Sequence, residues 1–169
     1  MFKRQAFDIN AYLRQCETDP CFICEMVSRN SKEQYRIIYE NESTIVFLNK
    51  YPTLYGYTLV APKIHLENSI EDFSIEEYLS LQRIIYWVAQ AVKQVTPTER
   101  IYLFTLGSQQ GITHIHWHIA PLPPGVPYKE QQLEAINFKR GIIKISKEEM
   151  TSLAKQIRKK MIDTKNILA

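Results

Sequence analysis

The chain is poor in cysteine and glycine, and it has no long uninterrupted apolar run. It contains 3 cysteines and 5 glycines in 169 residues, which is too little cysteine for the disulfide framework of a secreted domain. A membrane-spanning helix needs roughly 18 consecutive apolar residues, which no segment provides. Residues 1–10 lack the apolar core of a signal peptide. These absences predict a cytoplasmic protein in a reducing compartment, without a membrane partner.

The charge of the chain is small and evenly distributed. The 21 Lys and Arg residues exceed the 18 Asp and Glu residues by 3, so the sequence gives little support for a surface that binds nucleic acid duplexes. A small anionic substrate remains compatible with this charge. Because no repeat or low-complexity linker divides the chain, we expect a single domain over residues 1–169 with one substantial core.

Hydrophobic periodicity and capping residues predict both strands and helices. Strands are expected where β-branched and aromatic residues gather between turn residues, at residues 35–39, 44–48, 57–61, 100–106 and 113–120. Helices are expected at residues 8–14, from the capping box Ser74–Glu77 to Thr96, and after a second capping box at Ser146–Glu149. Runs of strands with segregated helices favour the α+β class with an antiparallel sheet.

Three of the four histidines, His114, His116 and His118, occupy alternate positions within five residues. Successive side chains of a strand point to opposite faces. A strand over residues 113–120 would therefore place the three imidazoles on one face and the intervening apolar side chains in the core.

A row of imidazoles is suited to phosphoryl chemistry. A neutral imidazole is a nucleophile near neutral pH, and its neighbours can donate hydrogen bonds to charge that develops during the reaction. The loop at residues 107–111 carries two glycines and can present backbone N–H groups to an anion. The same row could instead ligate zinc or copper, although its strand offers no Asp or Glu. Spacing alone leaves both readings open.

The run His114-Ile115-His116-Trp117-His118, followed by apolar residues, resembles the signature of the histidine-triad (HIT) superfamily. The segments Phe47–Pro52 and Gly56–His65 resemble the family's nucleoside-binding strands. Residues 100–125 resemble a bacterial branch of the family.

The resemblance implies a fold and an assembly. The expected fold is a half-barrel of antiparallel strands with a long central helix and a C-terminal helix, paired as a homodimer that binds a purine nucleotide. The family core corresponds to about residues 20–125, and residues 126–169 form a C-terminal extension with a helix.

The resemblance also implies roles for individual residues. His116 would be the nucleophile that forms a nucleotidyl-histidine intermediate, and His118 would contact the α-phosphate or the leaving group. Asn49 matches the residue that holds the ribose hydroxyls.

The loop before the triad matches the family only in part. Gln110 matches a glutamine near the phosphates, but Gly111 stands where the family commonly carries Ser or Thr. Ser108 and Gln109 are the candidates to replace that contact.

The pair Cys21-x-x-Cys24 is typical of metal ligation or redox chemistry. It is expected on a turn before all the predicted strands, whereas a thioredoxin-like pair lies at a helix N-terminus after a strand. A branch of the family combines such a pair with histidines that match His65 and His114, which implies a structural zinc site of two thiolates and two imidazoles. Cys16 has no expected partner.

The sequence therefore predicts an enzyme. The preferred function is hydrolysis at the α-phosphate of a purine nucleotide, of the dinucleoside polyphosphate or nucleoside phosphoramidate class, through the His116 intermediate. Nucleotidyl transfer or phosphorolysis would use the same intermediate. A nucleotide-binding signalling module with little turnover is the third alternative.

Overall fold

The computed structural model describes residues 2–31, 33–107 and 112–168, and its centre is an antiparallel sheet. The strand order is β2-β3-β4-β6-β5, with every neighbouring pair antiparallel. The strands are β2 (Ile37–Glu40), β3 (Thr44–Leu48), β4 (Thr58–Pro62), β6 (Trp117–Leu122) and β5 (Arg100–Phe104). The predicted α+β class is confirmed.

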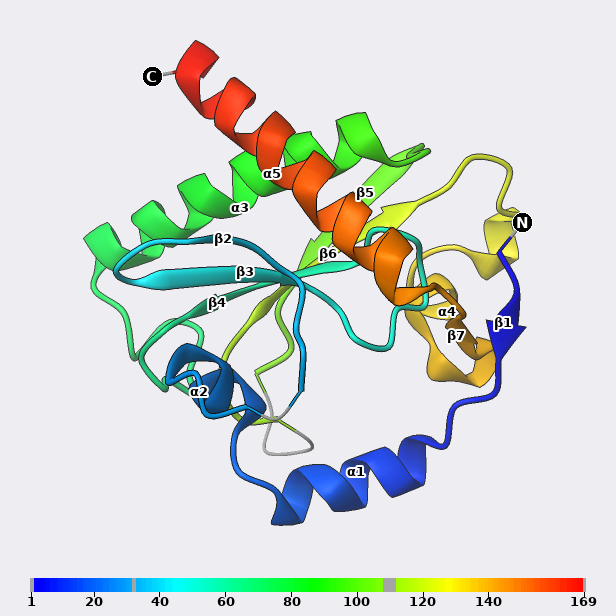
Figure 1. Cartoon of the computed structure of the whole chain (residues 1–169), viewed down its shortest axis with the longest axis horizontal. Coiled ribbons are helices and arrows are strands. Elements are labelled where there is room, and N and C mark those ends of the chain that lie inside the picture. Colours follow the sequence, from blue (N-terminus) through cyan, green and yellow to red (C-terminus); the bar gives the residue numbers. More distant parts are fainter. Residues whose placement is uncertain (1, 32, 108–111, 169) are drawn as a thin grey trace.

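Two long helices, α3 (Ile75–Val95) and α5 (Lys147–Leu168), cover one face of the sheet, while α2 (Phe22–Val27) lies on the other (Figure 1). Alternation along each strand sends neighbouring side chains to opposite faces. In β3, Leu48 belongs to the buried cluster shared with α3 and α5, whereas Phe47 belongs to the cluster shared with α2. The sheet therefore separates two apolar cores.

Local sequence signals explain why both long helices form. The predicted capping box at α3 is present: the Ser74 side chain accepts from the Glu77 N–H, and the Glu77 carboxylate accepts from the Ser74 N–H. At α5, the Ser146 hydroxyl accepts from the Glu149 N–H at 3.1 Å. The buried face of α5 carries the apolar residues expected from its helical period, which are Leu153, Ala154, Ile157 and Met161.

Residues near the N-terminus pair with the segment that precedes α5 in a small second sheet (Figure 1). Strand β1 (Arg4–Gln5) pairs antiparallel with β7 (Ile142–Ile143). At Gly141, φ is +74°, and a Cβ would lie 2.4 Å from the Gln5 carbonyl oxygen, so glycine is required for this close approach. The remaining helical segments are α1 (Ile9–Thr18), η1 (Tyr128–Glu130), α4 (Leu133–Ile136) and η2 (Phe138–Arg140).

Two predicted local structures were wrong. The strand expected at residues 113–120 begins only at Trp117, because the Ile115 N–H donates to the Leu66 carbonyl at 2.7 Å and so leaves the sheet. The cysteine pair expected on a turn lies at the start of α2, with Cys21 at the N-cap position, and β1 precedes it.

Candidate functional site

The structure divides the three alternating histidines into two groups, where the sequence predicted one face. His118 lies in β6, and its ring centroid is 4.7 Å from that of His116. The ring of His114 instead lies 4.7 Å from that of His65, beside the cysteine pair. This separation follows from the backbone: residues 114 and 116 precede the strand, so the period of two does not govern them. The intervening Ile115 is buried as predicted.

His116 is held in one tautomer. Its Nδ1 lies 2.8 Å from the His114 carbonyl oxygen, and because a carbonyl oxygen only accepts, Nδ1 carries the proton and donates. The lone pair of the neutral ring is then on Nε2. Burial lowers the pKa of His116, which favours this neutral form. The ring therefore has the electronic form that a nucleophile requires.

His118 is packed on the α2 side of the sheet between two aromatic residues. Its ring stacks on Phe104 with a centroid distance of 4.6 Å and an interplanar angle of 5°. Its Nδ1 lies 3.0 Å from the Tyr57 hydroxyl oxygen. Burial, followed by the neighbouring His116, lowers the pKa of His118 to about 3, so this ring is neutral near pH 7.

Tyr57 and Phe104 were not identified as site residues from the sequence. The sequence pattern predicted both as ordinary strand residues with packing roles. The contact arises from the pairing of β4 with β6, in which Leu59 is opposite His118, and of β5 with β6, in which Phe104 is opposite His118. Only strand register could have revealed them.

The predicted nucleotide contacts are only partly within the described chain. Asn49 follows β3, where its Oδ1 accepts from the Tyr51 N–H at 2.8 Å and its backbone N–H donates to the Tyr57 carbonyl at 2.8 Å. The side-chain amide thus shapes the loop between β3 and β4. The other four candidates, Ser108, Gln109, Gln110 and Gly111, lie outside the described residues.

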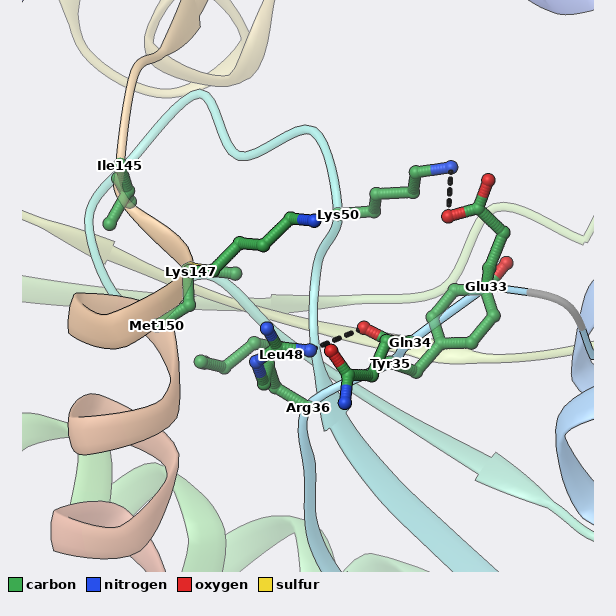
Figure 2. Close-up of a pocket in the computed structure, with 9 residues that line it drawn as sticks. All are labelled: Glu33, Gln34, Tyr35, Arg36, Leu48, Lys50, Ile145, Lys147 and Met150. Atoms are coloured by element: carbon green, nitrogen blue, oxygen red, sulfur yellow. Dashed lines mark hydrogen bonds and ion pairs between the residues drawn. The ribbon is translucent and has the colours of Figure 1, made fainter.

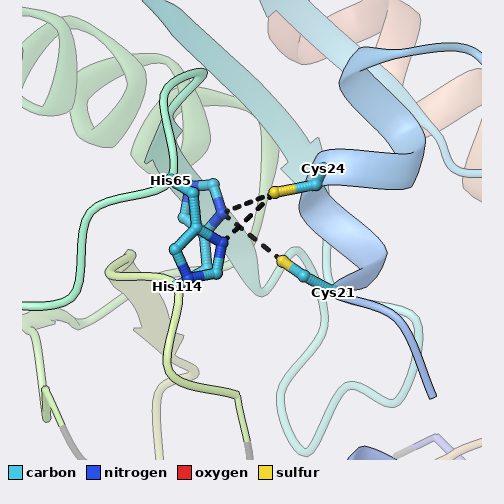
Figure 3. Close-up of side chains that lie close together, drawn as sticks. All are labelled: Cys21, Cys24, His65 and His114. Carbon is cyan, nitrogen blue, oxygen red and sulfur yellow. Dashed lines mark hydrogen bonds between the residues drawn. The ribbon is translucent and has the colours of Figure 1, made fainter.

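The second group of histidines joins the cysteine pair in one compact cluster (Figure 3). Each of Cys21, Cys24, His65 and His114 offers one ligand atom, and these atoms all lie within 4.8 Å of one another. Cys24 Sγ is 3.2 Å from His65 Nδ1 and 3.5 Å from His114 Nδ1, and Cys21 Sγ is 3.4 Å from His114 Nδ1. The residues therefore meet as the resemblance implied, and the cluster could bind a metal ion.

The geometry of this cluster fits tetrahedral zinc. Ligand bonds of about 2.0–2.3 Å at tetrahedral angles separate neighbouring ligand atoms by about 3.4–3.8 Å, close to the observed distances. His114 is fully buried, and its Nε2 donates to the Pro62 carbonyl at 2.9 Å. This bond leaves the Nδ1 lone pair directed at the sulfurs, as in metal-binding histidines.

A separate cleft lies on the α5 side of the chain (Figure 2). Lys50 forms an ion pair with Glu33 at 3.1 Å, and Arg36 Nε donates to the Thr151 hydroxyl at 2.7 Å. The lining residues are Glu33, Gln34, Tyr35, Arg36, Leu48, Lys50, Ile145, Lys147 and Met150. The cleft contains no member of the histidine or cysteine groups, and its basic residues are largely engaged within the protein.

Comparison with known proteins places the chain in a family. The HIT domain model matches residues 30–124, which is more than half of the chain, and the chain belongs to the HIT family. An uncharacterized HIT-like protein of Saccharolobus solfataricus is 30% identical over 129 residues, covering 70% of this chain and 91% of the relative. The family assignment made from the histidine run is confirmed.

Solved structures support the fold. A hypothetical histidine triad nucleotide-binding protein of Sulfolobus tokodaii has a TM-score of 0.69 and 28% identity, covering 86% of this chain and 94% of that one. A zinc-bound histidine triad family protein of Mycobacterium smegmatis has a TM-score of 0.68 at 19% identity, covering 90% and 99%, and this likeness concerns the fold alone. Family membership supports nucleotide binding and HIT-type activity in general.

Within the described part of the chain, no helix is both long enough and apolar enough to span a membrane.

Proposed function

We propose that the protein is a nucleotide hydrolase that cleaves the α-phosphate bond of a purine nucleotide through a nucleotidyl-His116 intermediate. The observation that carries this proposal is the hydrogen bond from His116 Nδ1 to the His114 carbonyl oxygen, which leaves the Nε2 lone pair for attack. The neighbouring His118 ring supplies a second imidazole at the same site. The substrate class we favour is a dinucleoside polyphosphate or a nucleoside phosphoramidate.

The reaction follows from these two rings. Nε2 of His116 attacks the α-phosphorus, an N–P bond forms, and the bond from phosphorus to the leaving group breaks with its electron pair on the leaving group. His118 donates a hydrogen bond to the α-phosphate or to that leaving group, where negative charge develops. Water then attacks the phosphorus and forms a P–O bond, and the N–P bond breaks with its electron pair returning to Nε2. The nucleoside monophosphate departs with the hydroxyl, and the other proton of the water passes to the solvent.

The nucleotide contacts complete the proposal. Asn49 would hold the ribose hydroxyls with the part of its amide that the loop does not use. Gln110 would contact the phosphates. Ser108, Gln109 and Gly111, which belong to the same loop, would also take part in binding the nucleotide. A solved structure described as a hypothetical histidine triad nucleotide-binding protein supports nucleotide binding in general.

A trapping experiment tests the mechanism. The purified protein is incubated with diadenosine polyphosphates, adenosine phosphoramidate and nucleotide sugars, quenched in denaturant, and measured by intact mass spectrometry. We expect an adduct of one nucleoside monophosphate that is lost in His116→Gly but present in the control Arg158→Ala, which changes an exposed residue of α5. Turnover without an adduct in any arm, or an adduct that survives His116→Gly, would contradict it.

The same experiment separates the alternatives. Discharge of the adduct to inorganic phosphate faster than to water would indicate phosphorolysis or transfer. Nucleotide binding by calorimetry, without adduct or turnover, would indicate a signalling module.

We further propose that Cys21, Cys24, His65 and His114 bind one structural zinc ion. Four protein ligands leave no open position for water, so zinc would fasten the start of α2 to the loop after β4 rather than act on substrate. We expect about one zinc per chain in tag-free protein, and a melting temperature lowered by chelation. Cys24→Ser should lose the metal, whereas Cys16→Ser, outside the cluster, should keep it. Full zinc content in Cys24→Ser would refute the assignment.

We also propose a homodimer and a cytoplasmic location. Strand β5 is at the edge of the sheet, and its Leu103 side chain is 52% exposed, an arrangement that native proteins usually cover. Sedimentation should show a dimer that Leu103→Lys dissociates and Arg100→Lys does not. A wild-type monomer would exclude this assembly, and cell fractionation tests the location.

A further inference from the structure

Tyr57 has a buried hydroxyl group that is directed at one atom of the site. The residue immediately precedes β4, and it is 5% exposed within the apolar cluster on the α2 side of the sheet. Its hydroxyl oxygen is 3.0 Å from His118 Nδ1. The two rings meet edge to face, with a centroid distance of 5.8 Å and an interplanar angle of 83°.

The direction of this hydrogen bond follows from the protons available. Burial raises the pKa of Tyr57 well above its usual value, so the hydroxyl keeps its proton. Across the described ranges, His118 Nδ1 is the one hydrogen-bond partner of that hydroxyl. If Nδ1–H donated instead, the buried hydroxyl proton would have no acceptor there, which is costly. The hydroxyl therefore donates, and the ring proton of neutral His118 is on Nε2.

We propose that Tyr57 is a positioning residue that holds His118 in the Nε2–H tautomer, so that this N–H faces the departing group as a donor. The proposal rests on the proposed function of the His116 and His118 pair. The stacked Phe104 ring complements Tyr57, because it restricts rotation of the His118 imidazole about the Cβ–Cγ bond.

The two catalytic imidazoles are thereby held in opposite tautomers. A backbone carbonyl fixes the proton of His116 on Nδ1, which leaves Nε2 as a nucleophile. The Tyr57 hydroxyl fixes the proton of His118 on Nε2, which makes that atom a donor. Without the hydroxyl, part of the His118 population would present a lone pair to the phosphate oxygens and repel them.

The test reads the tautomer directly and needs no substrate. Imidazole ¹⁵N shifts and two-bond ¹⁵N–¹H correlations are recorded near pH 7 on the full metal-loaded chain, with His118 assigned by comparison with His118→Asn. We expect an unprotonated Nδ1 and a protonated Nε2 in the wild type, and a shift toward mixed tautomers in Tyr57→Phe. The control is Tyr102→Phe, which belongs to the same apolar cluster but whose hydroxyl accepts from the Gln132 N–H. A protonated Nδ1 in the wild type overturns the proposal whether or not Tyr57→Phe folds.

A kinetic series then tests the link to the leaving group. Adenosine phosphoramidates with amine leaving groups of rising basicity are compared in wild type and Tyr57→Phe. We expect the variant to lower kcat by about 3- to 10-fold for the poorest leaving groups, from the loss of one hydrogen bond, with little effect on the best. An equal loss across the series would mean a merely structural role and would overturn the proposal. Failure of the wild type to turn over any of these phosphoramidates or a diadenosine polyphosphate, with the tautomers as expected, would instead contradict the proposed function.

Discussion

Replacement of Ile157 by alanine tests whether the C-terminal helix is part of the same cooperative unit as the HIT core. The family match ends at residue 124, and the sequence predicted residues 126–169 as an extension of a single domain. Ile157 of α5 is 0% exposed and belongs to the cluster that includes α3 and the sheet. If that packing holds, the variant should destabilise the whole chain.

The expected magnitude follows from the atoms removed. Ile157→Ala deletes three buried carbons, worth about 0.8 kcal/mol each by transfer, and leaves a cavity between packed helices that adds to the loss. Measured truncations of this kind cost about 2–5 kcal/mol, so we expect about 3–4 kcal/mol. Ile157→Val deletes one carbon and should cost about 1 kcal/mol. At about 2–4 °C per kcal/mol for a chain of this size, the alanine variant should melt roughly 10 °C lower.

The assay is urea unfolding with the metal content held constant, followed by both far-UV circular dichroism and tryptophan fluorescence. Arg158→Ala changes the next residue on the exposed face and should stay within about 0.5 kcal/mol of the wild type. Equal midpoints for Ile157→Ala and Arg158→Ala would refute the packing described. Two separate transitions would show that residues 126–169 unfold independently of the core.

The remaining predictions concern the site and the long helix. Ser74→Ala removes the N-cap of α3 and should lower the free energy of unfolding by about 1 kcal/mol in the same urea assay. Ser74→Asp, which can still cap the helix, should retain most of that stabilisation. His116→Ala should reduce turnover by several orders of magnitude while calorimetry shows nearly unchanged nucleotide affinity; unchanged turnover would exclude this nucleophile. The pKa of His118 is about 3 in the folded chain, below the unfolded value of about 6.5. As the pH falls below about 6.5, the unfolded chain binds a proton that the folded chain does not, so stability should fall by up to about 1.4 kcal/mol per pH unit. Urea titrations at pH 6 and pH 4 should show a smaller fall in stability for His118→Asn, and equal slopes would contradict the lowered pKa of His118.

Much of the fold could be predicted because it depends on neighbours in the sequence. Strand β3 has the predicted bounds, 44–48, and α3 begins at the predicted capping box. In both cases the signal is local, since side-chain alternation and reciprocal caps involve residues only two or three positions apart. The proposed role of His116 likewise rests on the histidine run. Its resemblance to a known family led to the correct family and to the four residues that gather beside α2.

The tertiary structure decided how those residues are divided and what holds them. The bond from the Ile115 N–H to the Leu66 carbonyl joins positions 49 apart and removes His114 from the strand that alternation predicted. Tyr57 reaches His118 across the register of two strands that are far apart in the chain. Periodicity reports which face of an element is apolar, but it does not report which distant polar group the other face will meet. The hydrogen bonds and the burial that set the tautomers and pKa values of the histidines arise only when distant strands pair. No sequence pattern could therefore report them.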